Sequence, residues 1–445
     1  MTKYILAVAL LTMGTVQAQE HFAGISTSQR TGILTTTINP SIIAATDNHI
    51  SVNILSFSGA MLNNKVGFSD LISGTNFDDA IFSGNKAASL RADAQILGPS
   101  ISLKVHKWVF SFSTQARTQA NMVNIDNRFG NAIVNNMISG SVSASILNHD
   151  QRASGVAWGE AGIGIARELF SVGPHSLYGG VNFKLLLAGT YINMSSSGFT
   201  GELAIQGENV SLTNAQSRLS FAYAGALAND FGKVPNFMDY FGKPGGLSTD
   251  VGVNYVWKDE SEDSYRITAG AAIKNMGSMN FNADNNRTVA YELNIPQGQY
   301  LDLAQFKNES DIKVIEQKLL QSGYVQQSSE RKDFKIKLPT TFVLHADVRL
   351  YSKFYLGGFL QQKMHSDMND TQLTAQNLIT ITPRFATHNF ELYVPVTNSE
   401  ISGTAVGIGT RYRGFYIGSG SVITGLANSS GTHQIDAYMG FRLAL

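Results

Sequence analysis

The sequence of 445 residues predicts an all-β fold: a transmembrane antiparallel β-barrel of about 14 strands, with a short N-terminal plug and small helices in its loops. Segments of about ten residues alternate between apolar and polar side chains, and this length suits a tilted membrane strand. Aromatic side chains gather near the ends of these segments, as at Trp257, Tyr351 and Tyr412. The connections are mostly short and long in turn, which bacterial membrane barrels require.

The composition excludes several other classes of protein. Charged residues make up 15% of the chain and aromatic residues 10%, and the 33 basic residues balance the 33 acidic ones. A nucleic-acid-binding protein needs a basic surface to displace counterions, so we expect no nucleic-acid partner. The chain has no cysteine, which excludes disulfides and cysteine-ligated zinc.

The first 18 residues have the features of a secretory signal peptide. Lys3 provides a basic start, residues 4–13 are largely apolar, and residues 16–18 form a small-residue cleavage site. The apolar run is too short to span a bilayer as a helix, and no later stretch reaches about 18 consecutive apolar residues. An exported chain of this kind either is soluble or spans a membrane as a β-barrel.

Strict alternation is clearest at the C-terminus of the chain. Ile435, Met439 and Leu443 share one face of the expected strand, whereas Asp436 and Arg442 share the other. In a membrane barrel the apolar face meets lipid and the polar face lines the interior. A soluble β-sandwich has the same period but buries the apolar face between two sheets. The segment lengths, the aromatic ends and the loop pattern favour the barrel.

The chain divides into a lead and a barrel. We expect residues 19–47, which are polar and rich in threonine, to form the plug, and residues 48–445 to form the barrel. Residues 199–212 and 216–228 form either an extracellular hairpin or two more wall strands, which gives about 16 strands in place of 14. The candidate strands are residues 48–58, 98–106, 107–117, 156–170, 175–193, 247–257, 264–275, 338–351, 353–363, 374–385, 389–397, 401–412, 414–422 and 433–444.

Helical spacing of apolar residues predicts short helices within residues 126–138 and 311–320, packed on the barrel rim. If the N-terminus is periplasmic, the tight connections lie on the periplasmic side. The long connections then lie outside, at residues 59–97, 118–155, 194–246 and 276–337. The expected location is the outer membrane of a Gram-negative bacterium, with outer-membrane lipid as the surrounding partner.

Motifs that carry catalysis are absent from the sequence. No G-x-S-x-G nucleophile elbow, H-E-x-x-H zinc helix or P-loop occurs. The nine histidines never stand two or four residues apart, so we expect neither a metal site nor a cofactor. We therefore expect that the protein is not an enzyme.

Charged side chains on the polar strand faces are the candidates for the lining of the lumen. They form either a selectivity lining or, as the mixed signs favour, structural packing among paired charges. These residues are Arg117, Asp250, Arg266, Lys274, His345, Asp347, Arg349, Asp436 and Arg442.

Residues 234–241 are an aromatic cluster in an expected loop. They form either an apolar entry site for a hydrophobic ligand or a short rim helix that begins at Pro235 and lies at the membrane interface. The candidate entry residues are Phe237, Met238, Tyr240 and Phe241.

Three short motifs resemble the FadL-like group of outer-membrane barrels. Asn39 and Pro40 resemble the Asn-Pro-Ala box of FadL, PorV and PorP/SprF-type proteins, with Ser41 in place of alanine. Residues 250–255 and 270–277 resemble a D-x-G-x-x-Y strand followed by a strand that ends in an Asn-hydrophobic-Gly corner. Leu338-Pro339 resembles the start of the next inward strand. The mature chain is also similar to an uncharacterised outer-membrane family of Bacteroidota, a domain of unknown function.

The resemblance implies two functions of different classes. A FadL-like barrel passes small hydrophobic molecules across the outer membrane, with residues 19–47 as its plug. A PorV-like or PorP/SprF-like barrel is instead a non-transporting scaffold for surface proteins or for type IX secretion and gliding components. The partner is accordingly either a hydrophobic small molecule or a surface or secretion protein.

Overall fold

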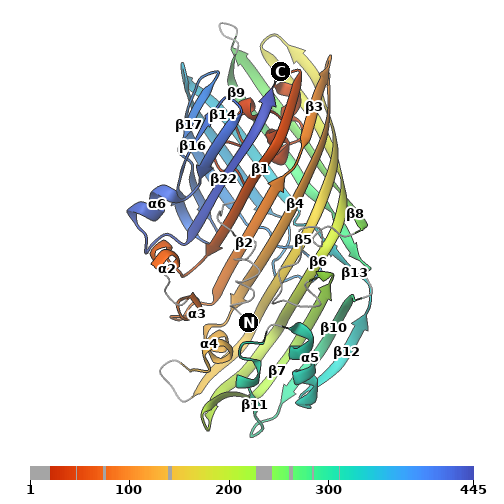
Figure 1. Cartoon of the computed structure of the whole chain (residues 1–445), viewed down its shortest axis with the longest axis vertical. Helices are drawn as coiled ribbons and strands as arrows, with labels where there is room; N and C mark the ends of the chain where they lie inside the picture. The colour runs from red at the N-terminus through yellow and green to blue at the C-terminus, as the bar shows by residue number, and fades with distance from the viewer. Residues whose placement is uncertain are drawn as a thin grey trace.

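In the computed structural model the chain forms a closed antiparallel β-barrel with a folded extension at one end (Figure 1). The structure describes residues 21–46, 48–73, 77–138, 143–226, 243–259, 264–282, 285–309 and 311–444. The expected signal peptide, residues 1–18, lies outside the described residues. Among the residues described, no helix is both long enough and apolar enough to cross a membrane.

The described residues contain 14 wall strands, as the sequence predicted, and the wall closes where β1 pairs with β22. Four wall strands are broken in two, because β2 continues into β3, β13 into β14, β17 into β18 and β19 into β20. The strands of the wall are β1 (Ile50–Asn63), β2 (Ala88–Leu97), β3 (Ser100–Val105), β4 (Trp108–Ile125), β5 (Ser143–Val172), β6 (His175–Gln206), β8 (Pro244–Asp259), β9 (Ser264–Phe281), β13 (Phe334–Lys337), β14 (Thr341–Tyr351), β15 (Phe354–Lys363), β16 (Leu378–Ala386), β17 (Phe390–Tyr393), β18 (Val396–Ser399), β19 (Gly403–Val406), β20 (Ile408–Tyr412), β21 (Phe415–Ser419) and β22 (Gln434–Ala444).

The two ends of the barrel differ. At one end, which we call the turn end, tight turns join the strands, as at residues 106–107, 173–174, 352–353 and 413–414. The opposite end, which we call the far end, carries the longer connections and the extension. The turn end is at the top of Figure 1 and the extension is at the bottom.

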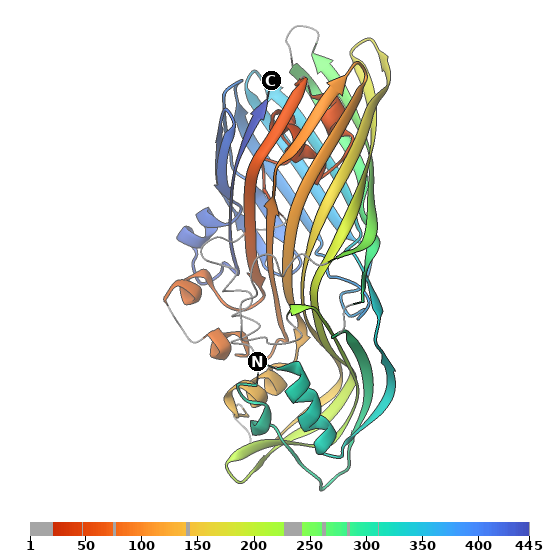
Figure 2. The same cartoon turned by 45° about the vertical axis from the view of Figure 1, so that its right-hand side comes forward.

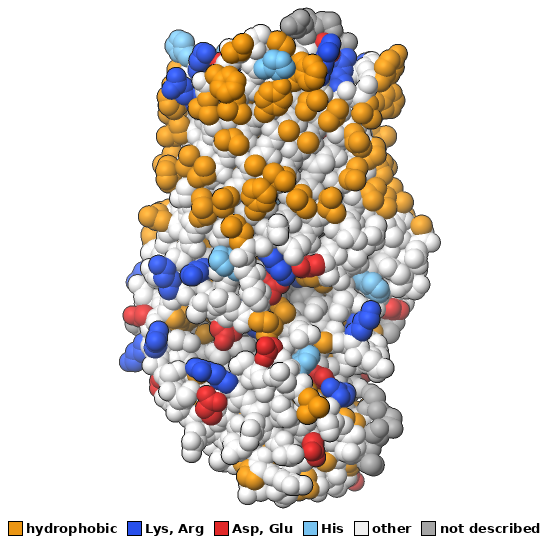
Figure 3. Space-filling view, turned by 180° about the vertical axis from the view of Figure 1, so that it is seen from behind, with side chains coloured by type: hydrophobic (Ala, Val, Ile, Leu, Met, Phe, Trp, Pro, Cys, Tyr) orange, Lys and Arg blue, Asp and Glu red, His pale blue; other side chains and the backbone are white. Residues whose placement is uncertain are grey.

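The outer face of the wall near the turn end is apolar. On β22 the side chain of Met439 is 43% exposed, whereas Tyr438 is 1% exposed, and Leu443 and Arg442 differ in the same way. Figure 3 shows hydrophobic side chains in a band around the half of the barrel nearest the turn end, with charged side chains below it. An apolar face that is exposed all round a closed wall is the lipid-facing surface of a membrane barrel. A two-sheet sandwich would have buried this face.

The extension forms because two strands outrun the membrane. β5 has 30 residues and β6 has 32, whereas a membrane strand needs about ten. β6 pairs with β8 as far as Leu187 and then, from Tyr191, with β7 (Asn209–Ala224), so β7 lies beyond the wall. The predicted strands at 199–212 and 216–228 are therefore a hairpin of the extension, and the alternative of about 16 wall strands is wrong.

The extension is a sheet with helices packed on one face (Figure 2). β7 pairs with β10 (Arg287–Ile295) and β11 (Leu301–Asp302), and β10 pairs with β12 (Val325–Arg331). The helices are α4 (Asn127–Asn135), α5 (Ile312–Gln321) and the 3₁₀ turn η5 (Ala304–Phe306). α4 and α5 confirm the two short helices that spacing predicted, but they pack under this sheet, because the sheet buries their apolar stripes.

Residues 21–46, which we call the N-terminal segment, lie inside the barrel near the turn end, where their red turns are visible in Figure 2. The segment contains two 3₁₀ helices, η1 (Gln29–Thr37) and η2 (Ile42–Ala45). Phe22 is buried against Tyr416 and Tyr438 of the wall. Three short helices lie at the far-end rim of the wall: α2 (Phe68–Ser73), α3 (Phe77–Ile81) and α6 (Val422–Ala427).

Candidate functional site

The Asn39 side chain fastens the N-terminal segment to the wall. Its Nδ2 lies 2.9 Å from the Val253 carbonyl oxygen, 3.2 Å from the Ala271 carbonyl oxygen and 3.1 Å from His345 Nε2. Its Oδ1 accepts a hydrogen bond of 2.9 Å from the Ser41 backbone N–H. One buried amide of the Asn-Pro box therefore ties the segment to β8 and β9, which carry the other two motifs at residues 250–255 and 270–277, and to β14.

Glycines in the wall make room for this contact. A Cβ atom at Gly252 would lie 2.1 Å from Asn39 Oδ1, and one at Gly180 would lie 2.6 Å from the Pro40 backbone. Only hydrogen fits in these places, so the wall can take the box at van der Waals distance. The missing Cβ at Gly180 lets the backbone of Pro40 lie directly against β6.

The charged residues that the sequence placed in the lumen mostly do lie inside the wall. Asp250 on β8 accepts from Lys184 Nζ at 3.0 Å and from the Asn275 N–H at 2.7 Å. Asp347 on β14 accepts from Arg384 and from the Tyr265 hydroxyl. These carboxylates have buried partners from other strands, as expected for charges removed from water.

The other inward residues bind the N-terminal segment or the wall itself. Lys274 donates to the Thr37 carbonyl and Arg442 to the Arg30 carbonyl. His345 contacts Asn39, as described above. Asp436 accepts from the Gly420 N–H and the Ser421 hydroxyl. A guanidinium nitrogen of Arg349 lies 3.2 Å from Asp259 Oδ2. The Arg117 guanidinium stacks over the Trp158 ring, 5.2 Å from its centroid.

Arg266 is the exception and lies on the outer face of the barrel. Trp257 pairs with Ile267 and Lys258 pairs with Tyr265, so Arg266 is an extra residue in β9. Such a bulge inverts the alternation on one side of it. The Arg266 side chain is 54% exposed and lies over the Trp257 ring, 5.6 Å from its centroid. Strict alternation in the sequence could not reveal the bulge.

Several interior charges were missed in the sequence because their strands carry weaker alternation. Glu160 lies 3.5 Å from Lys184, Glu391 lies 3.1 Å from Arg411, and Asp93 lies 2.7 Å from Arg91. Arg152 and Arg384 were missed as well. Charges of opposite sign at inward positions of neighbouring strands could have indicated these pairs. Recognising them requires the register of the strands, which the sequence does not give.

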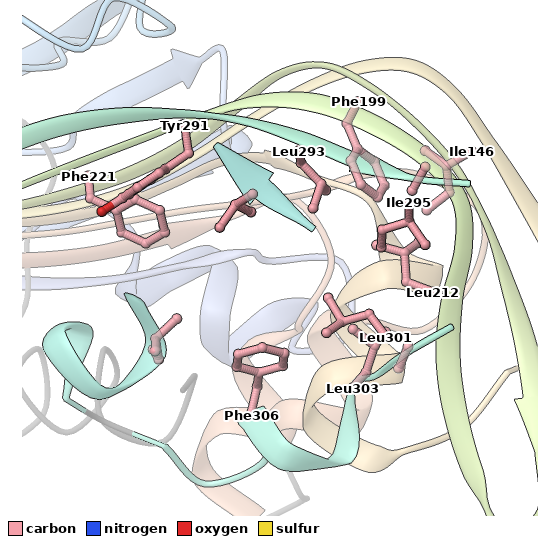
Figure 4. Packing of buried hydrophobic residues seen from close by; sticks show 14 of the residues in the cluster. Ile146, Phe199, Leu212, Phe221, Tyr291, Leu293, Ile295, Leu301, Leu303 and Phe306 are labelled. Atoms are coloured by element: carbon pink, nitrogen blue, oxygen red, sulfur yellow. The ribbon is translucent and has the colours of Figure 1, made fainter. Parts of the chain in front are cut away.

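The candidate apolar entry at Phe237, Met238, Tyr240 and Phe241 lies outside the described residues. The described residues contain another apolar site. A cavity of about 160 Å³, which we call the far-end cavity, lies between the extension sheet and its helices. Figure 4 shows side chains from the strands, such as Phe221 and Leu293, facing Leu303 and Phe306 across the core beside it.

The lining of the far-end cavity is almost wholly apolar. Its polar groups are bonded elsewhere: Gln151 Oε1 accepts from the Asp126 N–H at 3.1 Å, and Ser196 Oγ lies 2.7 Å from Ser217 Oγ. α4 contributes Phe129 and Ile133. The lining residues are Phe82, Met122, Ile125, Phe129, Gly130, Ile133, Val134, Gln151, Arg152, Ala153, Met194, Ser195, Ser196, Phe199, Leu212, Leu219, Phe221, Leu293, Leu301, Leu303, Phe306, Ile315 and Leu319.

Two further cavities follow toward the turn end. A cavity of about 230 Å³, which we call the middle cavity, has Met122 in common with the far-end cavity. A polar chamber of about 90 Å³ lies against the N-terminal segment and shares Arg91 and Ala375 with the middle cavity. Shared lining residues place the three cavities in series, from the apolar extension to the polar interior. Within the described ranges, no group of three acidic or histidine side chains is arranged to hold a metal ion.

Comparison with known proteins places the chain among sequences of unknown function. The family described as Family of unknown function (DUF5723) matches residues 40–420. None of the curated proteins matches the chain in sequence.

Several solved structures follow a similar course of the chain over most of its length. A TodX deltaS2S3 mutant monoaromatic hydrocarbon channel has a TM-score of 0.47 and 10% identity, covering 95% of this chain and 99% of its own. The Pseudomonas putida toluene transporter TodX has a TM-score of 0.41 and 8% identity, covering 96% and 98%. A Pseudomonas aeruginosa FadL homologue has a TM-score of 0.41 and 10% identity, covering 97% and 96%.

Proposed function

We propose that this chain, which belongs to the DUF5723 family, is an outer-membrane channel that passes small hydrophobic molecules into a Gram-negative bacterium. The observation that carries the proposal is the far-end cavity, which is apolar and lies in series with the interior of a membrane barrel. The lipid-facing band supports insertion in a membrane, and only outer membranes of bacteria and organelles hold such barrels.

The size of the far-end cavity indicates the size of the solute. An apolar protein cavity of about 150 Å³ stays dry and takes up benzene or xenon. The far-end cavity, at about 160 Å³, has comparable room for one aromatic ring or a short branched alkane. Burial of about 150 Å² of apolar solute surface contributes roughly 4 kcal/mol to the free energy of binding. This is a modest affinity, which is suited to release.

The direction of transport follows from the two ends. We place the extension outside the cell, where it takes solute from the medium, and the turn end in the periplasm. The N-terminal segment then acts as a plug at the periplasmic end, held by Asn39 and by the aromatic contacts of Phe22. Paired charges in the interior fill and brace the barrel, and they leave the apolar selectivity to the extension.

Two adjacent leucines of α5 offer a matched test. Leu319 lines the far-end cavity, whereas Leu320 is exposed. Leu319→Trp should fill the cavity and slow the uptake of radiolabelled benzene by cells that carry the protein in their outer membrane. Leu320→Trp should leave uptake unchanged. Equal uptake by both variants and by the unaltered protein would contradict a channel that loads at this cavity.

A non-transporting scaffold is the second candidate, and one observation favours it. Within the described sheet, β12 pairs with β10 alone and its residues from Gln326 to Arg331 are exposed, so it offers a strand edge on the extension. An edge of this kind can accept a strand of another protein. Mild extraction of membranes should then recover a stoichiometric partner, which Ser328→Pro should release. Recovery of the chain alone would argue against the scaffold.

A further inference from the structure

The connection between β15 and β16, residues 364–377, does not stay on the rim of the barrel. Its residues from Gln372 to Gln376 are each at most 5% exposed, whereas an ordinary connection lies on the surface. Its backbone bonds to Lys337 of β13: the Lys337 N–H donates to the Thr371 carbonyl at 2.8 Å, and the Leu373 N–H donates to the Lys337 carbonyl at 2.9 Å. The connection therefore turns inward along the wall.

The same connection also reaches a distant strand of the wall, β5. On β5, Arg152 Nη1 donates to the Asp367 carbonyl at 2.7 Å and Nη2 donates to the Gln372 carbonyl at 3.0 Å. β5 is separated from β15 along the wall by β6, β8, β9 and the β13–β14 strand. Residues 364–377 thus cross the interior, and we call them the crossbar.

Two side chains of β6 hold the tip of the crossbar. The Tyr191 hydroxyl donates to the Asp370 carbonyl at 3.1 Å, and Asn193 Nδ2 donates to Asp370 Oδ1 at 3.1 Å. Asn193 Oδ1 in turn accepts from Arg152 Nε. Arg152, Tyr191 and Asn193 therefore form one polar cluster, and each of them contacts the crossbar or supports a residue that does.

The crossbar lies where the three cavities meet. Arg152 borders the far-end cavity, while Thr374 and Ala375 border the middle cavity. Ala375 also borders the polar chamber next to the N-terminal segment. A route from the far-end cavity through the middle cavity to the polar chamber therefore runs past Arg152 and past Thr374 and Ala375 of the crossbar.

Arg152 depends on the crossbar for an electrostatic reason. Arg152 is fully buried, and its bonded acceptors are neutral oxygens, with Asp370 Oδ1 3.9 Å from its Nε. A buried guanidinium needs hydrogen-bond acceptors, because its desolvation is costly. The crossbar carbonyls supply two of them. If the crossbar leaves, water from the polar cavities must replace these two carbonyls, so Arg152 is either bonded to the crossbar or hydrated.

We propose that the crossbar, residues 364–377, is an internal gate and that Arg152 is its latch, so that solute leaves the far-end cavity only when the crossbar leaves Arg152. The proposal deepens the proposed function and names its regulation. It places a gate inside the barrel in addition to the plug, and it predicts that the gate controls small ions as well as hydrophobic solutes.

The absence of cysteine makes a direct test possible. In the full-length double variant Asn193→Cys/Asp370→Cys, a short thiol cross-linker should hold the crossbar closed. KCl conductance in planar bilayers should then fall to the closed level and return on cleavage of the linker. A control pair, Asn398→Cys/Thr404→Cys, joins exposed residues of the β18–β19 hairpin whose side chains lie 2.9 Å apart, and its cross-linking should change nothing.

The latch is tested by opening it. Arg152→Gln should raise KCl conductance at least about tenfold, because it removes two bonds from a charged donor. The cross-link between positions 193 and 370 should abolish this rise, and a heat-modifiable gel shift reports that the barrel has folded. The gate is overturned if the folded Arg152→Gln variant has the same conductance as the unaltered protein. It is also overturned if the 193–370 double-cysteine variant conducts equally well with and without the cross-link. Gated conductance without benzene uptake leaves the gate standing and refutes the proposed solute.

Discussion

Replacement of Asn39 by alanine should release the N-terminal segment from the wall. The Asn39 amide bonds the carbonyls of Val253 and Ala271 and accepts from the Ser41 N–H. Each buried hydrogen bond is worth about 1 kcal/mol net, so the loss of the two bonds to the wall weakens the seating of the segment by about 2 kcal/mol. That figure corresponds to a roughly thirtyfold larger population with the segment displaced.

Hydrogen exchange of the purified barrel measures this population. The amides of residues 38 and 39, which donate to the Thr35 carbonyl, should exchange roughly thirtyfold faster in Asn39→Ala, since exchange requires local opening. Asn39→Asp keeps the acceptor for Ser41 but turns a buried carboxylate oxygen toward the carbonyls of Val253 and Ala271, so its exchange should be at least as fast as that of Asn39→Ala. Unchanged protection of the amides of residues 38 and 39 in Asn39→Ala would refute the assignment of Asn39 as the anchor.

Three further outcomes are expected. Gly252→Ala places a Cβ 2.1 Å from the Asn39 amide and should also raise exchange in the segment, whereas Gly358→Ala, whose Cβ has 3.9 Å of clearance, should not. Burial lowers the pKa of Lys65 at the far-end rim from its ordinary 10.5 to about 8. Between these two pH values the unfolded chain binds more protons than the folded chain, so stability rises with pH. Protection of the adjacent α4 amides should therefore rise over this pH range, and Lys65→Met should abolish the rise. Lys184→Met leaves two buried carboxylates without their cation and should lower the free energy of unfolding by about 3–5 kcal/mol, seen as a lower temperature of the heat-modifiable gel shift.

The wall of the barrel could be predicted in some detail, because alternation is a local property. The 14 expected strands correspond one to one with the wall strands, and strand ends at the turn end differ by only a few residues. At the far end the strands run on, as β4 does to Ile125 and β5 does from Ser143. There neither face meets lipid, so the alternation that identifies a membrane strand fades. The expected long connections at 59–97 and 118–155 are shorter for this reason.

The site was less accessible to the sequence. The helical spacing of Phe129 and Ile133 revealed an apolar stripe, but not that α5 and the extension sheet supply the other walls of a cavity. The crossbar was not predicted, because residues 374–377 were expected to belong to the strand at 374–385, whereas β16 begins at Leu378. Arg152 was missed because residues 118–155 were expected to form a connection, whereas β5 already begins at Ser143. Arg266 was misplaced because the facing of a side chain depends on bulges and register as well as on parity.

The sequence by itself indicated a membrane barrel with about 14 wall strands, a lead before β1 and two amphipathic helices, and left open the alternative of about 16 strands that the structure excludes. Hydrophobic period and chain length are carried by neighbouring residues, and lipid imposes them on every wall strand alike. The tertiary structure alone decided that the lead lies inside the barrel on Asn39, that charges of distant strands pair, and that residues 364–377 cross the interior to Arg152. These contacts arise when the wall closes and brings inward side chains from many strands into one small volume, which no local pattern encodes.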